Sequence, residues 1–201
     1  MPKAAAKPKS VTLPGEVRAC RDQKAWGAWL AKNHRRSPHG VWIRLAKKGS
    51  GTKSITSPEA LELALCYGWS DAQIRPESES TWLQRFMPRA RRSIWSKRNR
   101  EKALALIENG KMQSAGLEEI ERAKADGRWE DAYDSPKNAT VPLDLERALR
   151  KNARASAFFK TLNAANRYAV LWRIQTAKKP ETRVRRIQTI VAMLEKGETF
   201  H

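Results

Sequence analysis

Strand-like and helix-like patterns are distributed unequally along this chain of 201 residues. Two segments have the branched and aromatic composition of strands, Val41–Leu45 (VWIRL) and Thr81–Phe86 (TWLQRF), and both lie in the first half. From Ser96 onward, apolar residues recur at helical spacing between serine, glycine and proline signals. We therefore predict an α+β fold, in which a small mixed sheet packed with helices is followed by a C-terminal helical domain.

The helical pattern is interrupted once, over residues 131–142 (DAYDSPKNATVP), where turn-forming residues gather. We predict an α+β domain over residues 13–131, a linker over residues 132–142 and a helical domain over residues 143–201. The first twelve residues, MPKAAAKPKSVT, are rich in lysine, alanine and proline. They are predicted to form a disordered basic tail, 1–12.

Start and stop signals define the helices of the first half. Residues 22–33 are predicted to form one helix, with tryptophans on its apolar face. Ser57 is expected to cap a second helix, which stops at Gly68. The segment Ser70–Ser80, rich in glutamate and serine, is predicted to be a loop.

Six further helices are predicted after Ser96. Ser96 and Ser114 are expected to cap the first two, which Gly110 and Gly127 close. The last helix is expected to bury one apolar stripe, Val184, Ile187, Val191 and Leu194. The four helices of the C-terminal domain are predicted near Leu143–Leu149, Ala153–Leu162, Ala164–Ala177 and Glu181–Lys196.

The charge balance favours anionic partners. Forty Lys and Arg against 21 Asp and Glu give a net charge of +19 and a sequence pI near 10.4. The expected partner is an anionic small molecule or an acidic protein, and non-specific nucleic-acid binding is possible. No apolar stretch approaches the roughly 18 residues of a membrane span, and no secretory signal is recognised, so we predict a cytoplasmic location. The oligomeric state is left open.

Signals for a metal or for covalent catalysis are missing from the sequence. His34 and His39 have no cysteine or acid at ligand spacing, so no metal site is predicted. No nucleophile elbow, phosphate-binding loop or dinucleotide-binding fingerprint is present, so no cofactor is predicted and catalytic residues stay unknown. Cys20 and Cys66 do not form a disulfide framework. These absences favour a binding protein over an enzyme.

The stretch Thr81–Arg100, TWLQRFMPRARRSIWSKRNR, combines seven cations with two tryptophans and no acid. It is either solvated surface charge or part of an anion pocket. In the second interpretation Arg85 and Arg89 bind the anion and Trp95 forms a wall. Cations at the expected start of the Ser96 helix oppose the helix dipole, which favours a visiting anion.

A helix end upstream supplies further candidates. Trp69 and Asp71 follow Gly68 as the chain leaves the predicted second helix. Trp69 is either core or a member of the ligand site. Asp71 either orders a turn or faces the cations across a cleft, where it would orient an arginine. The complete predicted ligand site is Trp69, Asp71, Arg85, Arg89, Trp95, Lys97 and Asn99.

Three segments resemble the bacteriocin-protection, YdeI or OmpD-associated family: EALELALCYGWSDAQ, the stretch from RFMPRARR to KADGRW, and AKKPETRVRRIQTIVAMLEKG. The resemblance extends over nearly the whole chain past the first dozen residues. It implies an N-terminal α+β domain, a C-terminal helical domain and a role in tolerance to bacteriocins or antimicrobial peptides. It implies no reaction, cofactor or catalytic residue. Ala72 stands where the family has a glycine.

Three functions are compatible with the sequence. The first is a bacteriocin-protection-type protein that binds an anionic ligand or partner through a basic, aromatic-lined pocket. The second is non-specific nucleic-acid binding through the tail lysines and the surface of residues 183–186. The third is an enzyme on a small anionic substrate, with Asp71 as its acid or base. A second basic cluster is expected mostly to cover a solvent face of the last helix: Arg173, Lys178, Lys179, Arg183, Arg185 and Arg186.

Overall fold

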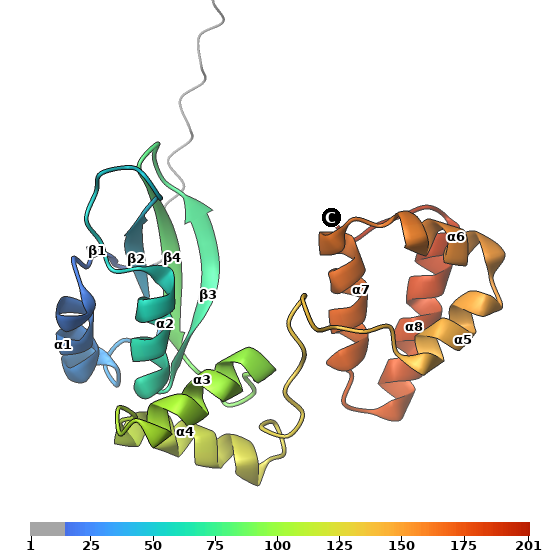
Figure 1. The fold of residues 1–201 in the computed structure, drawn as a ribbon. Helices are drawn as coiled ribbons and strands as arrows, with labels where there is room; N and C mark the ends of the chain where they lie inside the picture. The colour runs from blue at the N-terminus through green and yellow to red at the C-terminus, as the bar shows by residue number, and fades with distance from the viewer. Residues whose placement is uncertain (1–14) are drawn as a thin grey trace, which may run out of the picture. The chain divides into compact units, whose positions relative to one another are not determined.

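The structure is a computed structural model that describes residues 15–201 (Figure 1). The predicted basic tail, 1–12, lies outside these residues. The described chain forms two compact units: unit 1 consists of residues 15–93 and 102–125, and unit 2 of residues 94–101 and 126–201. The division falls within helix α3 (Lys97–Glu108). The predicted domain limits stay a prediction.

Unit 1 contains a four-stranded sheet in the order β1-β2-β4-β3. β1 runs parallel to β2, and the other neighbouring pairs are antiparallel. The predicted α+β class with a small mixed sheet is therefore confirmed. The strands are β1 (Val17–Ala19), β2 (Val41–Ala46), β3 (Trp69–Pro76) and β4 (Thr81–Pro88).

The predicted loop at Ser70–Ser80 is wrong for most of its length, because β3 occupies residues 69–76. The strand is held by backbone pairing with β4, from Trp69 opposite Pro88 to Pro76 opposite Trp82. β3 is an edge strand, and four consecutive residues from Asp71 are exposed. An exposed edge tolerates the polar composition that suggested a loop. A shift in register between Asp71 and Ile74 places a bulge in this strand.

Helices α1 (Gln23–Asn33) and α2 (Ser57–Cys66) pack against one face of the sheet. The cap of α2 is Thr56, one residue before the predicted Ser57. Thr56 Oγ1 accepts a hydrogen bond from the Glu59 amide, and the Glu59 carboxylate accepts one from the Thr56 amide. The reciprocal capping box provides hydrogen-bond partners for two backbone amides, whereas a serine cap alone would provide one, so the helix is capped at Thr56. Gly68 follows the helix with a φ of 73°, as its predicted stop role requires.

Tryptophans fill the core between α1 and the sheet. Trp26 is completely buried, stacks on Trp29 with ring centroids 5.2 Å apart and contacts Phe86 and Trp69 at 5.7 and 6.4 Å. Its indole Nε1 donates a hydrogen bond to the Ala60 carbonyl of α2 at 3.0 Å. Trp26 therefore joins α1, α2 and the sheet. The predicted apolar face of α1 is confirmed.

Two glycines permit close packing beside α2. Helix α4 (Ser114–Ala125) contacts α2, and a Cβ on Gly116 would lie 2.4 Å from the Cys66 carbonyl oxygen. A Cβ on Gly68 would lie 2.8 Å from the Ala115 carbonyl oxygen. Ser114 is the first residue of α4 and not its cap, since the Gln113 carbonyl accepts the amides of Gly116 and Leu117.

Unit 2 contains the four predicted C-terminal helices around their own core. Val184 is 55% exposed, so it does not belong to the buried stripe that was predicted for the last helix. Ile187, Ile190 and Leu194 are the residues buried there. The helices are α5 (Leu143–Arg150), α6 (Ala153–Thr161), α7 (Ala164–Gln175) and α8 (Pro180–Glu195). Among residues 15–201, no helix is long and apolar enough to cross a membrane.

Candidate functional site

The seven residues of the predicted ligand site fall in both units. Trp69, Asp71, Arg85 and Arg89 belong to unit 1, and Trp95, Lys97 and Asn99 belong to unit 2.

Trp69 and Asp71 lie on the sheet face that packs against the helices. Trp69 is 1% exposed, and its Nε1 donates to the His34 carbonyl at 3.1 Å, so this ring belongs to the core. Asp71 is exposed and accepts a weak hydrogen bond from Gln84 Nε2 at 3.4 Å. No non-glycine residue in the described chain has a positive φ, so Ala72 fits its extended backbone without strain.

Arg85 and Arg89 are held by different partners. Arg85 lies opposite Trp42 in the strand register and therefore projects from the face opposite to Asp71. Its Nη2 donates to the His39 carbonyl at 2.8 Å. Arg89 is 6% exposed, and its Nη2 lies 3.4 Å from Ser70 Oγ. The structure thus separates Asp71 from Arg85 by the thickness of the sheet.

Trp95, Lys97 and Asn99 surround the start of α3. Trp95 is 2% exposed and meets Trp129 edge to face, with ring centroids 4.8 Å apart. Lys97 Nζ forms an ion pair with Asp134 at 2.8 Å. The Asn99 amide donates to Ser96 Oγ at 3.1 Å, as the predicted cap requires. Trp69 and Trp95 are both interior, so neither ring offers a face to a ligand.

A pocket of about 410 Å³ opens in unit 2 between α7 and α8. Apolar and aromatic side chains, three arginines and two threonines line it, and its lining contains no acid. The lining residues are Trp172, Arg173, Thr176, Arg185, Arg186, Thr189, Ile190 and Phe200.

Two of the three arginines of this pocket, Arg173 and Arg186, are held by backbone carbonyls and neighbouring side chains. Arg173 Nη1 donates to the Ala169 carbonyl at 3.0 Å, and its Cζ lies 3.6 Å from the centre of the Phe200 ring. Arg186 Nη1 donates to the Arg173 carbonyl and to Thr176 Oγ1. Arg185 is exposed at the rim. Within residues 15–201, none of the three arginines forms an ion pair with a carboxylate.

Phe200 is fixed as a wall of the pocket by a polar anchor on α7. Asn166 is 6% exposed, and its Oδ1 accepts a hydrogen bond from the His201 amide at 3.0 Å. Its Nδ2 returns one to the His201 carbonyl at 3.3 Å. These two bonds hold the backbone next to Phe200 against α7.

The second basic cluster is less uniform than a solvent face. Arg183 binds both oxygens of Asp144 at 2.5 and 3.0 Å and the Ile174 carbonyl at 3.0 Å. Lys178 pairs with Asp131 at 3.3 Å. Lys178, Lys179 and Arg185 are exposed as predicted, whereas Arg173, Arg183 and Arg186 are half-buried and do not belong to a solvent face. One sequence pattern could have indicated the pocket: an arginine next to Trp172 is followed by an arginine pair on the next helix.

Neither cysteine is a poised nucleophile. Cys20 and Cys66 are 4% and 3% exposed. Burial raises the pKa of Cys66 to about 11 and raises the pKa of Cys20, so both are neutral thiols at pH 7. No three histidine, cysteine or acidic side chains gather as a metal ligand set in the part of the chain that the structure describes.

Two family models match the chain. Residues 18–119, just over half of the chain, match the family described as a domain of unknown function, DUF8412. The chain belongs to the DUF8412 family. Residues 138–197 match the family described as bacteriocin-protection, YdeI or OmpD-associated, which confirms that resemblance for this part of the chain. The same resemblance was predicted for the first half of the chain, but that part matches the DUF8412 family instead. No curated protein and no solved structure matches the chain.

The two matches cover different structural features, the sheet and the α7/α8 pocket. The DUF8412 match contains β2, β3, β4 and the helices that cover them. The bacteriocin-protection match contains every lining residue of the α7/α8 pocket except Phe200. The pocket is thus a feature of the part similar to bacteriocin-protection proteins.

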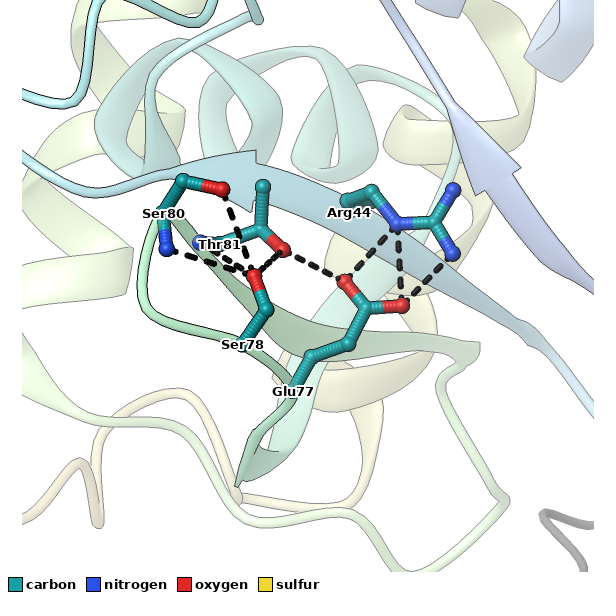
Figure 2. Close-up of polar contacts among 5 residues, drawn as sticks. All are labelled: Arg44, Glu77, Ser78, Ser80 and Thr81. Carbon is teal, nitrogen blue, oxygen red and sulfur yellow. Dashed lines mark hydrogen bonds and ion pairs between the residues drawn. The ribbon is translucent and has the colours of Figure 1, made fainter.

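A polar network joins the β3–β4 hairpin of the DUF8412 region to β2 (Figure 2). Arg44 Nε donates to Glu77 Oε2 at 2.7 Å, and Arg44 Nη2 donates to Oε1 at 2.6 Å. Thr81 Oγ1 donates to the same carboxylate at 2.8 Å, and Ser78 Oγ lies 2.7 Å from Thr81 Oγ1. Hydrogen bonds from Arg44 lower the pKa of Glu77, and those to Glu77 raise the pKa of Arg44.

This pair makes stability depend on pH. Because the pKa of Glu77 is lower in the folded protein than the usual 4.5, its contribution is complete above pH 4.5. The contribution disappears as the pH falls through the folded value. We expect Glu77→Gln to lower the melting temperature at pH 7 and to flatten the acid side of the profile. Glu79→Gln, an exposed acid of the same turn, is the control and should leave the profile unchanged.

Proposed function

We propose that this protein binds a small organic anion in the pocket between α7 and α8. The observation that supports the proposal is the set of three arginines around apolar walls without a carboxylate partner in the described chain. A buried or half-buried cation is stable when an opposite charge accompanies it. A ligand anion would supply that charge.

The volume and the lining of the pocket support an anion attached to a flat apolar body. Its volume of about 410 Å³ is within the range of roughly 300–1,000 Å³ that small-molecule pockets occupy. Trp172, Ile190 and Phe200 provide the apolar walls. A guanidinium offers paired N–H donors that match the oxygens of a carboxylate, sulfonate or phosphate.

The arginines have different roles in the proposed binding. Arg173 and Arg186 are already oriented by carbonyl oxygens and the Phe200 ring, so little side-chain freedom is lost when a ligand binds. Arg185, at the rim, is free to close on the anionic group. The proposal keeps the predicted chemistry of a basic, aromatic-lined pocket and assigns it to residues of unit 2.

The test uses anilinonaphthalene sulfonate, a flat aromatic anion whose fluorescence rises in apolar sites. We expect saturable binding to the full chain with a stoichiometry of one by calorimetry. Arg185→Gln should weaken binding by roughly tenfold or more, since a charge-assisted hydrogen bond contributes about 1.5–3 kcal/mol. Arg147→Gln removes an equal charge from the exposed surface of α5 and should bind as the unchanged protein does.

A second ligand separates charge from apolar contact. Phenylnaphthylamine has the same aromatic body without the sulfonate, and we expect it to bind at least tenfold more weakly. Equal binding of the two dyes, or equal losses in Arg185→Gln and Arg147→Gln, would contradict the proposal. Thermal melts of both variants check that the fold of unit 2 is intact.

A further inference from the structure

The sheet of unit 1 has a second face, which we call the arginine face. Trp69 and Phe86 project toward the helices, so residues that alternate with them project the other way. Trp42 lies opposite Arg85 in the register, and Leu83 lies opposite both Arg44 and Arg75. These pairings place the arginine face across β2, β4 and β3. It is defined by Trp42, Arg44, Arg75, Leu83 and Arg85.

Two guanidinium groups of this face lie over one indole. The Cζ atoms of Arg75 and Arg85 are 5.6 and 5.7 Å from the centre of the Trp42 ring. Trp42 is 0% exposed and Leu83 is 3% exposed. The arginine side chains therefore form the outer layer above these apolar residues. Cation–π contacts restrict both guanidiniums to defined positions.

The charges of this face are unbalanced. Glu77 is engaged by Arg44 and Thr81, as Figure 2 shows. Arg75 and Arg85 have no ion pair with any acid in residues 15–201. Two like charges beside one ring repel each other, and an anion between them would remove that repulsion.

The basic surface continues past the sheet into a hollow of about 340 Å³. Its lining includes Arg44 of the arginine face together with Arg21 and Lys53, and it contains no acid. β2 contributes Arg44 and Ala46 to this hollow, and from Trp42 to Ala46 the strand advances by about 13 Å at roughly 3.3 Å per residue. The cations are therefore spread along the strand direction and are not gathered around one position.

We propose that the arginine face and the adjoining hollow bind the phosphate backbone of single-stranded nucleic acid. Fixed guanidiniums are fork-shaped donors for phosphate oxygens, and their planes stack on unpaired bases. An acidic peptide would need exposed apolar anchors, but Trp42 and Leu83 are covered by the arginines. The net charge of +19 attracts a polyanion from a distance. This inference is independent of the α7/α8 pocket.

The experiment measures the anisotropy of a labelled twenty-nucleotide oligothymidine bound to the full chain at several salt concentrations. Each phosphate contact contributes about 0.7 to the slope of log affinity against log salt for a single strand. We expect the double variant Arg75→Gln, Arg85→Gln to lose about 1.4 from this slope, the value for two contacts. Its affinity at low salt should fall by at least tenfold.

The matched control is the double variant Arg91→Gln, Arg92→Gln. It removes the same charge from two exposed arginines of the same unit, and it should keep the slope nearly unchanged. Within residues 15–201 the Arg75 side chain makes a cation–π contact and no backbone hydrogen bond, so Arg75→Gln alone should show half of the slope change even if the double variant is unstable.

Two results would overturn the proposal. Equal slope losses in both double variants would mean that binding depends on net charge and not on this face. Displacement of the oligonucleotide by polyglutamate at equal charge concentration would mean that the face selects carboxylates of an acidic protein.

Discussion

Replacement of Trp26 by alanine is expected to lower the free energy of unfolding of unit 1 by about 3–5 kcal/mol. The ring is fully buried, contacts three other aromatic rings and bonds the Ala60 carbonyl of α2. Its loss leaves a cavity and removes the indole hydrogen bond at the point where α1, α2 and the sheet meet. The remaining side chains are parts of a close-packed core and cannot collapse fully into the gap.

Hydrogen exchange measured on the full chain separates the two units in this test. Amides of α2 and β2 should exchange faster in Trp26→Ala, and amides of α7 and α8 serve as the internal reference. Trp29→Ala is the control on the same helix, because Trp29 is only half-buried and should lose less than half as much. Equal losses at the two positions would show that Trp26 is not the centre of this core.

The substitution Gly116→Ala is expected to destabilise unit 1 by about 1–3 kcal/mol, although alanine favours helices. The added Cβ would lie 2.4 Å from the Cys66 carbonyl oxygen and 2.8 Å from that of Leu65. Both are backbone atoms at the end of α2, so α4 must move away as a whole. Relief by a side-chain rotation is excluded for these two contacts.

Gly27→Ala is the matched control in a helix of the same unit. A Cβ at Gly27 would meet only Leu63 Cδ2 at 3.8 Å, an ordinary contact. Removing a glycine from the interior of α1 should stabilise unit 1 by up to about 1 kcal/mol. Denaturant unfolding should therefore give opposite signs for the two substitutions. Two shifts of the same sign would contradict the close approach of α4 to α2.

Local signals predicted most helices of this fold and the two central strands. Gly68 marked the end of α2 because only glycine adopts its left-handed backbone easily, and this signal needs no tertiary information. β3 was missed because its conformation is fixed by pairing with β4 and not by its own composition. Val184 was misplaced for a related reason. Helical spacing shows which apolar residues share a face of α8, but it does not show how much of that face the neighbouring helices cover.

The site was harder to predict than the fold. Trp69 and Trp95 were proposed as site residues from their neighbours in sequence, yet both rings are buried. Trp69 packs against Trp26 and Trp29, and Trp95 packs against Trp129. The walls of the α7/α8 pocket come from Trp172 and Phe200, which are far apart in sequence and meet through the Asn166 anchor. Spacing along a chain does not reveal such a meeting.

The bulge in β3 limits how two copies of the protein can pair along this edge of the sheet. An exposed edge strand is a template on which another strand can add by backbone hydrogen bonding. The shift of register between Asp71 and Ile74 interrupts the regular alternation of free N–H and C=O groups along this edge. A second β3 could match only one half of the edge at a time. The irregular strand thus protects a protein with an exposed Ile74 from growing into an extended sheet.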